Sequence, residues 1–461
     1  MIDRNIQAFW QHIQGKRIAV CGIGHNNLPV IRQLTDKGAQ VLACDRRDRA
    51  QLGQTADELE AAGVELSLGE GYLAHLDDVD MILRTPGMKP YLPEFERARE
   101  RGIPASSEME LFFALCPAPI YGVTGSDGKT TTTTIIAGLL EASGKTVHLG
   151  GNIGRPLLPE IEKVQPDHVV VVELSSFQLT RMAQSPHVAV ITNVAPNHLD
   201  WHTDMAEYID AKRNLMRFQK TGDRVVLNAD NEVTASFVPD AADECCLFSR
   251  RHEVAHGAFL GEDNVLYMRA DGQDVPVMNR SDILIPGDHN VENYLAAIAA
   301  VWGEVAPATI AEYARTFGGV PHRSELLRVR RGVKWYNDSI GSSPSRTIAG
   351  LKSFDRRVIL IAGGYDKHIP YDPLGPVAAD TVKTAILMGA TGDKIEQAIR
   401  ACSDLPIVRV KNMEEAVAAA NRLAQDGDIV FMSPASASFD MYRNFEERGN
   451  HFRRLVMEME E

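Results

Sequence analysis

The chain has 461 residues, with 48 Lys and Arg against 62 Asp and Glu, so its formal net charge is −14. Hydrophobic residues make up 44% and charged residues 24%, typical of a folded chain with several domains of about 100–200 residues each. The acidic balance argues against a protein that binds nucleic acid or an anionic membrane through a basic surface.

Targeting and redox features indicate a cytoplasmic protein. No apolar run reaches the ~18 residues that a membrane-spanning helix needs. The first residues, MIDRNIQAFWQHIQGKR, lack the basic and then apolar layout of a signal peptide. The six cysteines form no C-x-x-C pair, which is typical of inert thiols in a reducing compartment. We therefore expect no membrane partner and no nucleic-acid partner.

The first block of the chain alternates strands with helices. RIAVCGIG (17–24) predicts a buried strand, a helix follows to Lys37, and QVLACD (40–45) predicts the next strand. A further strand in VDMILRTPGM (79–88) ends at a Thr-Pro-Gly turn. This spacing predicts a parallel sheet with right-handed crossovers.

The second block opens at PIYGVTGSDGKTTTTT (119–134) and contains two apolar runs, HVVVVEL (168–174) and HVAVITNV (187–194). Apolar runs without alternation are typical of a sheet that is covered on both faces. Residues 223–285 carry shorter, more polar runs and predict a subsidiary β region. A predicted helix at 290–302 closes the block.

The third block follows a predicted linker, GGVPHR (318–323), and repeats the strand–loop pattern at 357–367, 383–394 and 428–440. NMEEAVAAANRLAQDG (412–427) predicts an amphipathic helix with Asn412 as its N-cap and Gly427 as its stop.

We therefore predict an α/β protein of three consecutive domains. They are a Rossmann-like N-terminal domain (1–107), a central P-loop ATPase-like domain (108–319) and a Rossmann-like C-terminal domain (320–461).

The strongest chemical signal is the loop Gly125-Ser-Asp-Gly-Lys129-Thr130, between a predicted strand and a Thr-rich helix start. Glycines expose backbone amides, the helix N-terminus attracts anions, and Lys129 adds a positive charge. The Thr130 hydroxyl suits a Mg²⁺ ligand beside the phosphates. The loop departs from G-x-x-x-x-G-K-[ST] at Val123, but its setting favours phosphate binding over an ordinary Gly-rich turn.

Two further polar residues follow the apolar strands of the second block. Glu173 ends one strand, and His198 lies a few residues beyond the next. Ligands of open parallel sheets collect at the carboxyl ends of strands, so both side chains are candidates for a metal bound to ATP phosphates.

Gly22-Ile-Gly24, followed by Asp45 at the end of the next strand, resembles a dinucleotide fingerprint. Asn27 stands where that pattern has its third glycine, which disfavours a nicotinamide dehydrogenase. Binding of another nucleotide ribose or diphosphate and simple packing of a tight turn both stay open.

Other polar residues give no functional signal by their spacing alone. Lys212, on a predicted helix, is typical of a solvated surface lysine. Asn290 and Asn293 fit a helix N-terminus, and His322-Arg323 fits a hinge.

Together these motifs resemble the Mur ligases, ATP-dependent amide-forming enzymes of peptidoglycan precursor synthesis. The resemblance covers nearly the whole chain and is carried by seven motifs in family order: GSDGKTT (125–131), GGNIG (150–154), ELSSFQL (173–179), NVAPNHLD (193–200), PHR (321–323), NDS (337–339) and SPASASFDMYRNFEERG (433–449). The last motif points to the member that adds D-glutamate to UDP-N-acetylmuramoyl-L-alanine, using ATP and Mg²⁺. A monomer is expected.

The resemblance implies a role for each matching residue. The catalytic residues would be Lys129, His198 and Lys212, with Lys212 carbamylated, and the metal ligands Thr130, Glu173, His198 and Lys212. ATP would be bound by Gly125, Ser126, Asp127, Gly128, Lys129, Thr130, Thr131, Asn290, Asn293, Arg323 and Asp338. The UDP substrate would be bound by Gly24, Asp45, Thr85, Gly87, Asn152, Ser175 and Gln178. The added amino acid would be bound by Ser342, Lys367, Ser438, Phe439 and Phe445.

The chain departs from the family pattern at three places. Ile340-Gly341-Ser342 replaces a Lys-Ala-Thr segment, Asn197 replaces an acidic neighbour of His198, and the first-domain loop reads His25-Asn26-Asn27. A sister ligase, such as another Mur ligase or a folylpolyglutamate synthetase, and a variant that adds L-glutamate stay open. So does a nucleotide-dependent regulator without ligase activity, which the retained Lys129, Glu173, His198 and Lys212 disfavour.

Overall fold

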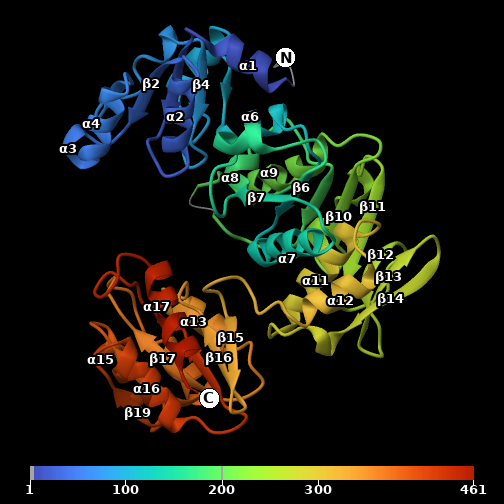
Figure 1. Ribbon diagram of the computed structural model, residues 1–461, viewed down its shortest axis with the longest axis vertical. Coiled ribbons are helices and arrows are strands. Elements are labelled where there is room, and N and C mark those ends of the chain that lie inside the picture. Colours follow the sequence, from blue (N-terminus) through green and yellow to red (C-terminus); the bar gives the residue numbers. More distant parts are fainter. Residues whose placement is uncertain (1–4, 199–200, 461) are drawn as a thin grey trace. The chain divides into compact units, whose positions relative to one another are not determined.

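The computed structural model describes residues 5–198 and 201–460. Within these residues the strands form three sheets, each in a different part of the sequence (Figure 1). The chain divides into two compact units, one of Met1–Met278 with Glu292–Ile310 and one of Asn279–Val291 with Ala311–Glu461. The α/β alternation predicted from the sequence is confirmed, while the three exact domain boundaries stay predictions.

The first sheet has five parallel strands in the order β3-β2-β1-β4-β5. They are β1 (Arg17–Cys21), β2 (Gln40–Asp45), β3 (Glu65–Leu68), β4 (Met81–Arg84) and β5 (Ala105–Ser106). The accompanying helices are α1 (Ile6–Ile13), α2 (Asn27–Asp36), α3 (Arg49–Leu52), α4 (Gln54–Ala61), η1 (Leu76–Asp78) and α5 (Pro93–Glu100). The three strands predicted in this block are confirmed.

The second sheet has the order β14-β13-β12-β11-β10-β9-β6-β8-β7, and its strands from β12 to β7 are parallel. Those strands are β6 (Ile120–Thr124), β7 (Val147–Gly151), β8 (Val169–Glu173), β9 (Val188–Ile191), β10 (Arg224–Asn228), β11 (Glu244–Ser249) and β12 (Gly257–Leu260). β13 (Val265–Ala270), antiparallel to β12, and β14 (Gln273–Asn279) complete it. The prediction of a subsidiary β region is corrected, because β10 and β11 continue the parallel ladder of the same sheet.

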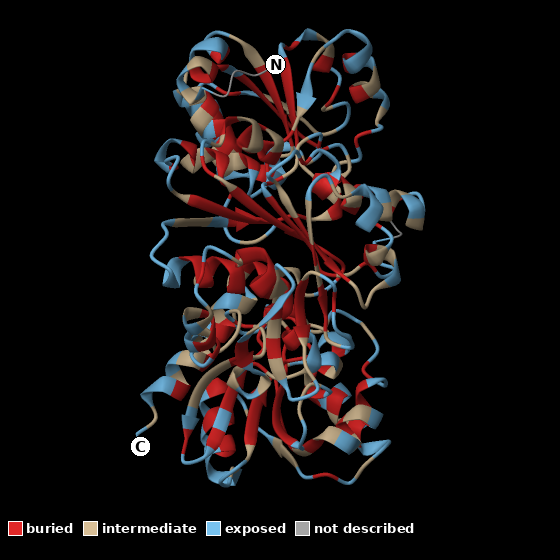
Figure 2. Ribbon diagram, turned by 90° about the vertical axis from the view of Figure 1, so that its right-hand side faces the viewer, coloured by how far each residue is buried: buried red, intermediate tan, exposed pale blue. Residues whose placement is uncertain are grey.

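The helices of this block are α6 (Glu108–Leu115), α7 (Lys129–Ala142), η2 (Leu158–Lys163), α8 (Ser176–Leu179), α9 (Met205–Arg217), α10 (Glu232–Ala235), η3 (Val238–Asp240), η4 (Arg280–Asp282), α11 (Asp288–Val301) and α12 (Pro307–Ala314). β6, β8 and β9 are buried along their whole length, as the apolar runs predict (Figure 2). Continuous burial fixes these strands and therefore fixes the loops at their carboxyl ends.

The third sheet has the order β15-β16-β20-β17-β18-β19, and only its β15–β16 pair is antiparallel among the pairs described. Its strands are β15 (Glu325–Arg330), β16 (Val333–Asn337), β17 (Val358–Gly363), β18 (Val382–Met388), β19 (Ile407–Arg409) and β20 (Ile429–Met432). Its helices are α13 (Pro344–Leu351), α14 (Leu374–Thr381), α15 (Gly392–Arg400), α16 (Met413–Leu423) and α17 (Phe445–Glu458).

Helix α16 confirms one predicted boundary and corrects the other. The Asn412 side chain accepts a hydrogen bond from the Glu415 amide, as an N-cap does. The helix ends at Leu423 rather than at Gly427. Ala424 is already extended, and the Gln425 amide donates to the Asp428 carboxylate at 2.8 Å, so a side-chain acceptor outside the helix ends it early.

Candidate active site

Three adjacent strands place the predicted phosphate and metal residues at one edge of the second sheet. β6 lies between β8 and β9, and all three run parallel. The loop 125–128 follows β6, Glu173 is the last residue of β8, and the segment leading to His198 follows β9. The carboxyl ends of parallel strands share an edge, which is where ligands bind in such sheets.

The loop after β6 has a backbone shape that only glycine accommodates at its first position. Gly125 has a φ of +154°, and a Cβ there would lie 1.9 Å from the Thr192 hydroxyl oxygen. The Ser126 amide donates to the Asn193 carbonyl and the Asp127 amide to the Asn193 side chain, both at 2.9 Å. The segment after β9 therefore holds the loop in place. The backbone amides in the first turn of α7 have no acceptor within the helix, so they are available to bind an anion.

Replacement of Gly125 by Ala tests this loop shape. We expect kcat/KM for ATP to fall at least ~10-fold. A tenfold decrease corresponds to ~1.4 kcal/mol, and backbone strain at such a position costs about that much or more. Gly144→Ala is the matched control, since Gly144 also has a positive φ (+89°) but open space around it. Equal effects of the two substitutions on kcat/KM would contradict the assignment of this loop to ATP binding, because only a Cβ on Gly125 would meet Thr192 and Asn193.

Lys129 and Thr130 begin α7 at the predicted phosphate position. The Lys129 ammonium donates to the carbonyls of Gly125 and Ser126 at 3.0 and 2.9 Å, so it bends back over the loop. The Thr130 hydroxyl donates to the buried Glu173 carboxylate at 2.7 Å, and the Asn152 side-chain amide donates to the other oxygen of Glu173, also at 2.7 Å. A hydroxyl, a carboxylate and a side-chain amide are oxygen donors of the kind that Mg²⁺ takes.

Among the described residues, no hydrogen bond or ion pair joins the His198 side chain to Thr130, Glu173 or Asn152. His198 is exposed, has a φ of +54°, and its ring is 5.0 Å from that of Phe177 on α8. Its role as a metal ligand stays a prediction.

Lys212 is almost fully buried, which corrects the interpretation of it as a surface lysine. It lies on α9, and its ammonium donates to the Gly125 carbonyl at 2.7 Å. Burial, with a smaller contribution from the Lys129 charge, lowers the pKa of Lys212 to about 7. The helix thus presents to the phosphate loop an amine that is largely neutral above that pH.

Tyr208 is a residue that the sequence reasoning missed. It lies one turn before Lys212 on α9 and is fully buried. Its hydroxyl is 2.9 Å from the Ser126 hydroxyl, and its ring faces the Lys212 ammonium at 4.7 Å. The i, i+4 spacing to Lys212 was the available signal, because such residues share a helix face. Tyr208 therefore holds both the loop and the lysine.

Helix α11 brings Asn293 to the phosphate loop. The Asn293 side-chain oxygen accepts from the Thr132 hydroxyl at 3.1 Å, and a Cβ on Gly128 would lie 2.4 Å from that oxygen. Asn290, one turn earlier, donates its side-chain amide to the Pro286 carbonyl at 2.6 Å, which joins the first turn of the helix to the segment before it. Both fit the predicted helix N-terminus.

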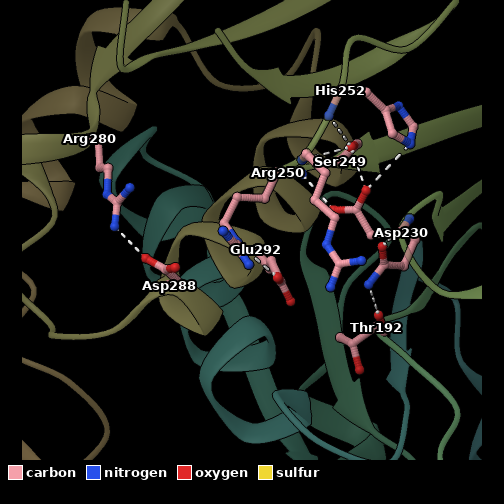
Figure 3. Close-up of polar contacts among 10 residues, drawn as sticks. Thr192, Asp230, Ser249, Arg250, His252, Arg280, Asp288 and Glu292 are labelled. Carbon is pink, nitrogen blue, oxygen red and sulfur yellow. Dashed lines mark hydrogen bonds and ion pairs between the residues drawn. The ribbon is translucent and has the colours of Figure 1, made fainter. Parts of the chain in front are cut away.

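Loops after β10 and β11 anchor this helix (Figure 3). The Asp230 carboxylate accepts from the Ser249 hydroxyl at 2.7 Å and from the Arg250 amide at 2.8 Å. The Arg250 guanidinium then donates to Glu292, the residue before Asn293, at 3.0 Å. This chain of contacts fixes the part of α11 that faces the loop, and no motif in the sequence had indicated it.

In the first sheet, the predicted UDP-binding residues share the carboxyl edge of β2, β1 and β4. Gly24 and Gly87 are exposed in loops, and a Cβ on Gly22 would lie 2.8 Å from a Thr85 methyl carbon. The Asp45 carboxylate accepts from the Ile23 amide at 2.8 Å and pairs with Arg47. Burial would raise the pKa of Asp45, but the hydrogen bonds from Arg47 and Ile23 hold it below its ordinary value. Asp45 therefore already has a structural role in shaping the loop.

The other predicted substrate residues also have structural partners. Ser175 and Gln178 form a capping box at the start of α8, in which the Gln178 amide donates to the Ser175 hydroxyl and the Ser175 amide to the Gln178 side chain. Gln178 is buried and Asn152 is exposed. Contacts of these three residues with substrate stay predictions.

In the third sheet, Asp338 lies at the end of β16 and is buried. Its carboxylate accepts from the Ser433 hydroxyl at 2.7 Å and from the Ser324 amide at 3.1 Å, and Arg323 lies close enough to lower its pKa. Burial outweighs these contacts and raises the pKa of Asp338 to about 6.

The predicted amino-acid residues follow β16, β20 and β17, which are neighbours in this sheet. An isolated bridge joins Tyr365 to Ala437, so the loop of Lys367 lies against the loop of Ser438 and Phe439. Lys367 and Phe439 are exposed, and Ser438 is buried. Ser342 follows β16 in the loop before α13. The structure thus brings these loops to one edge.

Arg448 on α17, also missed in the sequence, fixes these loops. It is 1% exposed and donates to the carbonyls of Ser339, Ser436 and Ala437 at 2.8–3.1 Å. The Ser339 hydroxyl in turn donates to the carbonyl of Phe445 at 2.7 Å. Burial lowers the pKa of Arg448 to about 10, which leaves it charged at neutral pH.

Comparisons with known proteins identify the fold and the motifs together. Three family models match the chain: the MurD-like N-terminal domain over residues 16–107, the Mur ligase middle domain over 123–301, and the Mur ligase glutamate ligase domain over 322–436. A "UDP-N-acetylmuramoylalanine--D-glutamate ligase" of Acetivibrio thermocellus is 50% identical over 466 residues, covering 100% of both chains. The chain belongs to the Mur ligase family.

Further relatives of the same printed name support that membership. One from Symbiobacterium thermophilum is 50% identical, covering 96% of this chain and 98% of the relative, and one from Clostridium kluyveri is 48% identical, covering 99% and 100%.

Solved Mur ligase structures share the fold. A UDP-N-acetylmuramate-alanine ligase of Thermotoga maritima has a TM-score of 0.56 at 17% identity, covering 96% of this chain and 99% of that one. A UDP-N-acetylmuramoyl-L-alanyl-D-glutamate–2,6-diaminopimelate ligase has a TM-score of 0.58 at 16% identity, covering 98% and 94%. The three-domain α/β prediction is thereby confirmed.

No helix among the described residues of this Mur ligase is long and apolar enough to cross a membrane.

Proposed function

We propose that this Mur ligase is an ATP-dependent amide ligase that adds D-glutamate to UDP-N-acetylmuramoyl-L-alanine in peptidoglycan precursor synthesis. The observation that carries the substrate assignment is full-length identity of 48–50% to relatives named for that reaction. The loop after β6, with Lys129 bent over it and the paired Thr130 and Glu173, supports the use of ATP. The cytoplasmic location and the monomeric state stay predictions.

The reaction has two steps. The substrate carboxylate attacks the γ-phosphoryl group of ATP, which gives an acyl phosphate and ADP. The amine of D-glutamate then attacks the acyl carbon, and phosphate leaves as the amide forms. Lys129, at the first turn of α7, stabilises the negative charge that develops on the transferred phosphoryl group.

The hydroxyl of Thr130 and the carboxylate of Glu173, which lie side by side, fit a divalent cation beside the phosphates. Thr130, Glu173, His198 and the carbamate of Lys212 would hold Mg²⁺, which neutralises charge on the phosphate oxygens when it is bound. The chain's own contribution is to orient the Glu173 carboxylate by two hydrogen bonds, one from the Thr130 hydroxyl and one from the Asn152 side-chain amide.

Lys212 is suited to carbamylation because its amine is buried and its pKa lies at about 7. A neutral amine attacks CO₂, forms an N–C bond and loses one proton, so the side chain becomes an anion. The resulting carbamate would lie next to Gly125, where the positive charges of Lys129 and Mg²⁺ stabilise it.

Positioning of two substrates supplies much of the rate in such a reaction. Asn290, Asn293, Arg323 and Asp338 are proposed to bind ATP. Gly24, Asp45, Thr85 and Gly87 are proposed to bind the uridine diphosphate group, and Asn152, Ser175 and Gln178 the muramoyl part. A sister ligase is disfavoured by the name that these relatives share. A variant that adds L-glutamate would be detected by product analysis with D- and L-glutamate supplied separately.

The experiment is a phosphate-release assay on the purified protein with ATP, Mg²⁺, UDP-N-acetylmuramoyl-L-alanine and D-glutamate. We expect release only when all four are present. Release that continues without D-glutamate would indicate a hydrolase or a regulator rather than a ligase.

Lys367→Ala tests the proposed amino-acid pocket, which also comprises Ser342, Ser438, Phe439 and Phe445. D-glutamate brings two carboxylates, and the exposed Lys367 ammonium can bind one of them. We expect KM for D-glutamate to rise ~10–100-fold, the effect of losing a charged hydrogen bond.

Kinetics with each substrate varied in turn separate this role from a general defect. KM for ATP and for the uridine substrate should change much less than KM for D-glutamate. Lys411→Ala is the matched control, because Lys411 is also exposed and lies in the same domain, between β19 and α16. Equal increases in all three KM values would mean that Lys367 is not in the pocket.

A further inference from the structure

A second group of potential metal ligands lies outside the proposed active site. Among the residues that the structure describes, one group of three His, Cys, Asp or Glu side chains brings its donor atoms within 4.8 Å of one another: Glu244, Cys246 and His256. Glu244 and Cys246 are on β11, and His256 immediately precedes β12. The ligase reaction proposed above uses none of them.

The local backbone explains why the three side chains converge. Glu244 and Cys246 are two residues apart on a strand, so they lie on the same face of the sheet. His256 joins them because the Leu247 amide donates to the His256 carbonyl at 2.9 Å. The next residue, Gly257, allows an unusually close approach of the two strands, since a Cβ there would lie 1.9 Å from the Leu247 carbonyl oxygen.

The donor atoms already have the spacing of a tetrahedral zinc site. The Cys246 sulfur is 3.3 Å from His256 Nε2 and 3.5 Å from Glu244 Oε1, and 3.6 Å separates that nitrogen from that oxygen. Zn–S bonds of about 2.3 Å and Zn–N or Zn–O bonds of about 2.0–2.1 Å at tetrahedral angles place ligand atoms about 3.3–3.6 Å apart. The match requires no rearrangement of the strands.

A second residue orients the carboxylate. The Arg224 guanidinium pairs with the other oxygen of Glu244 at 2.9 Å and also donates to the carbonyls of Ala299, Ala300 and Trp302. One oxygen of Glu244 is thus held by Arg224, while Oε1 faces Cys246 and His256. Such outer partners of ligating carboxylates are characteristic of metal sites.

We propose that Glu244, Cys246 and His256 bind one zinc ion, with water as the fourth ligand. A thiolate, an imidazole and a carboxylate suit Zn²⁺ and disfavour Mg²⁺ and Ca²⁺, which prefer oxygen ligands alone. The exposure of the Glu244 and His256 side chains, 38% each, leaves a path for the ion and the water.

The site is separate from the phosphate loop. β11 is three strands away from β6 in the sheet, and Glu244 is at the amino end of its strand, whereas Gly125 follows the carboxyl end of β6. The ion would therefore join β11 to the loop before β12 and stabilise this part of the sheet, without taking part in ligation.

Cobalt titration of the metal-free, full-length protein tests the proposal. Co²⁺ in such a site gives strong visible absorption typical of tetrahedral coordination and a thiolate-to-cobalt charge-transfer band in the near ultraviolet. We expect these bands to saturate at one equivalent and to disappear when Zn²⁺ is added. Cobalt in the Mg²⁺ site would lack the thiolate band, because that site has no sulfur ligand.

Two variants and one matched control complete the test. Cys246→Ser should remove the thiolate band, because it removes the sulfur ligand. His256→Gln should weaken Zn²⁺ binding by more than the ~10–100-fold cost of losing an outer partner. Cys245→Ser, the neighbouring thiol on the opposite face of β11, should leave the band intact. Added Zn²⁺ should raise Tm in the unsubstituted protein and in Cys245→Ser, and should leave it unchanged in the other two. A missing band, or a band that survives Cys246→Ser, would show that the three residues form only a hydrogen-bonded cluster and would overturn the proposal.

Discussion

Replacement of Lys129 by Ala should reduce kcat at least ~10²–10³-fold, the usual cost of removing a group that stabilises transition-state charge. The Lys129 ammonium reaches over the loop at 2.9–3.0 Å from two of its carbonyls, so a bound phosphate would take the place of contacts that the loop itself makes. Its side chain contributes little to core packing, and Tm should therefore stay close to that of the unsubstituted protein. Product formation and a thermal melt measure the two quantities.

Lys145→Ala is the control for Lys129. Lys145 follows the other end of α7, is exposed, and pairs with Glu304 at 3.0 Å. A surface ion pair of this kind contributes little, so activity and Tm should both be unchanged. Near-normal turnover by a folded Lys129→Ala protein would be incompatible with ATP binding at this loop.

Lys212→Ala should also lose activity at least ~10²-fold, because the carbamate that supports the metal can no longer form. Lys220→Ala, which removes an exposed lysine shortly after α9, should have no effect. Small carboxylic acids should partly restore the Lys212→Ala enzyme by occupying the place of the carbamate, and they should not stimulate Lys129→Ala. Full activity of Lys212→Ala without additives would exclude carbamylation as a requirement.

The pH dependence of the same residue follows from its pKa. The amine is mostly neutral above pH ~7, so reactivation of CO₂-depleted enzyme by bicarbonate should be faster at pH 8 than at pH 6. Without CO₂, the unfolded chain, with a lysine pKa of about 10.4, binds more protons than the folded one between pH ~7 and ~10. Folding stability should therefore rise with pH across that window, and Lys212→Met should remove this contribution. If folding stability rises with pH by the same amount in Lys212→Met, a different group must be titrating.

Local sequence signals predicted the parts of the molecule that depend on neighbouring residues in the chain. The loop 125–130 was predictable because glycines, a lysine and a following helix are adjacent, and the β8 and β9 strands because their apolar runs are continuous. The N-cap at Asn412 was predictable for the same reason, whereas the end of α16 was not. The helix ends where the Gln425 amide donates to the Asp428 carboxylate. That hydrogen bond depends on how the chain turns after Leu423.

Features that depend on how elements pack or pair with one another could not be predicted from the sequence. Lys212 is buried only because α9 packs its face against β6 and the phosphate loop, and a lysine on an amphipathic helix is otherwise typical of a surface. Arg448 acquires its role from carbonyls more than ten residues away along the chain. The convergence of Glu244 and Cys246 with His256 likewise depends on the pairing of β11 with β12.

The most direct measurement of the central claim is the identity of the product. The purified protein is incubated with ATP, Mg²⁺, UDP-N-acetylmuramoyl-L-alanine and either D-glutamate, L-glutamate or another amino acid, and the products are analysed by mass spectrometry alongside phosphate release. We predict one glutamyl residue added per phosphate released, with D-glutamate strongly preferred. Faster ligation of L-glutamate or of a different amino acid, or phosphate release without a ligated product, would contradict the account.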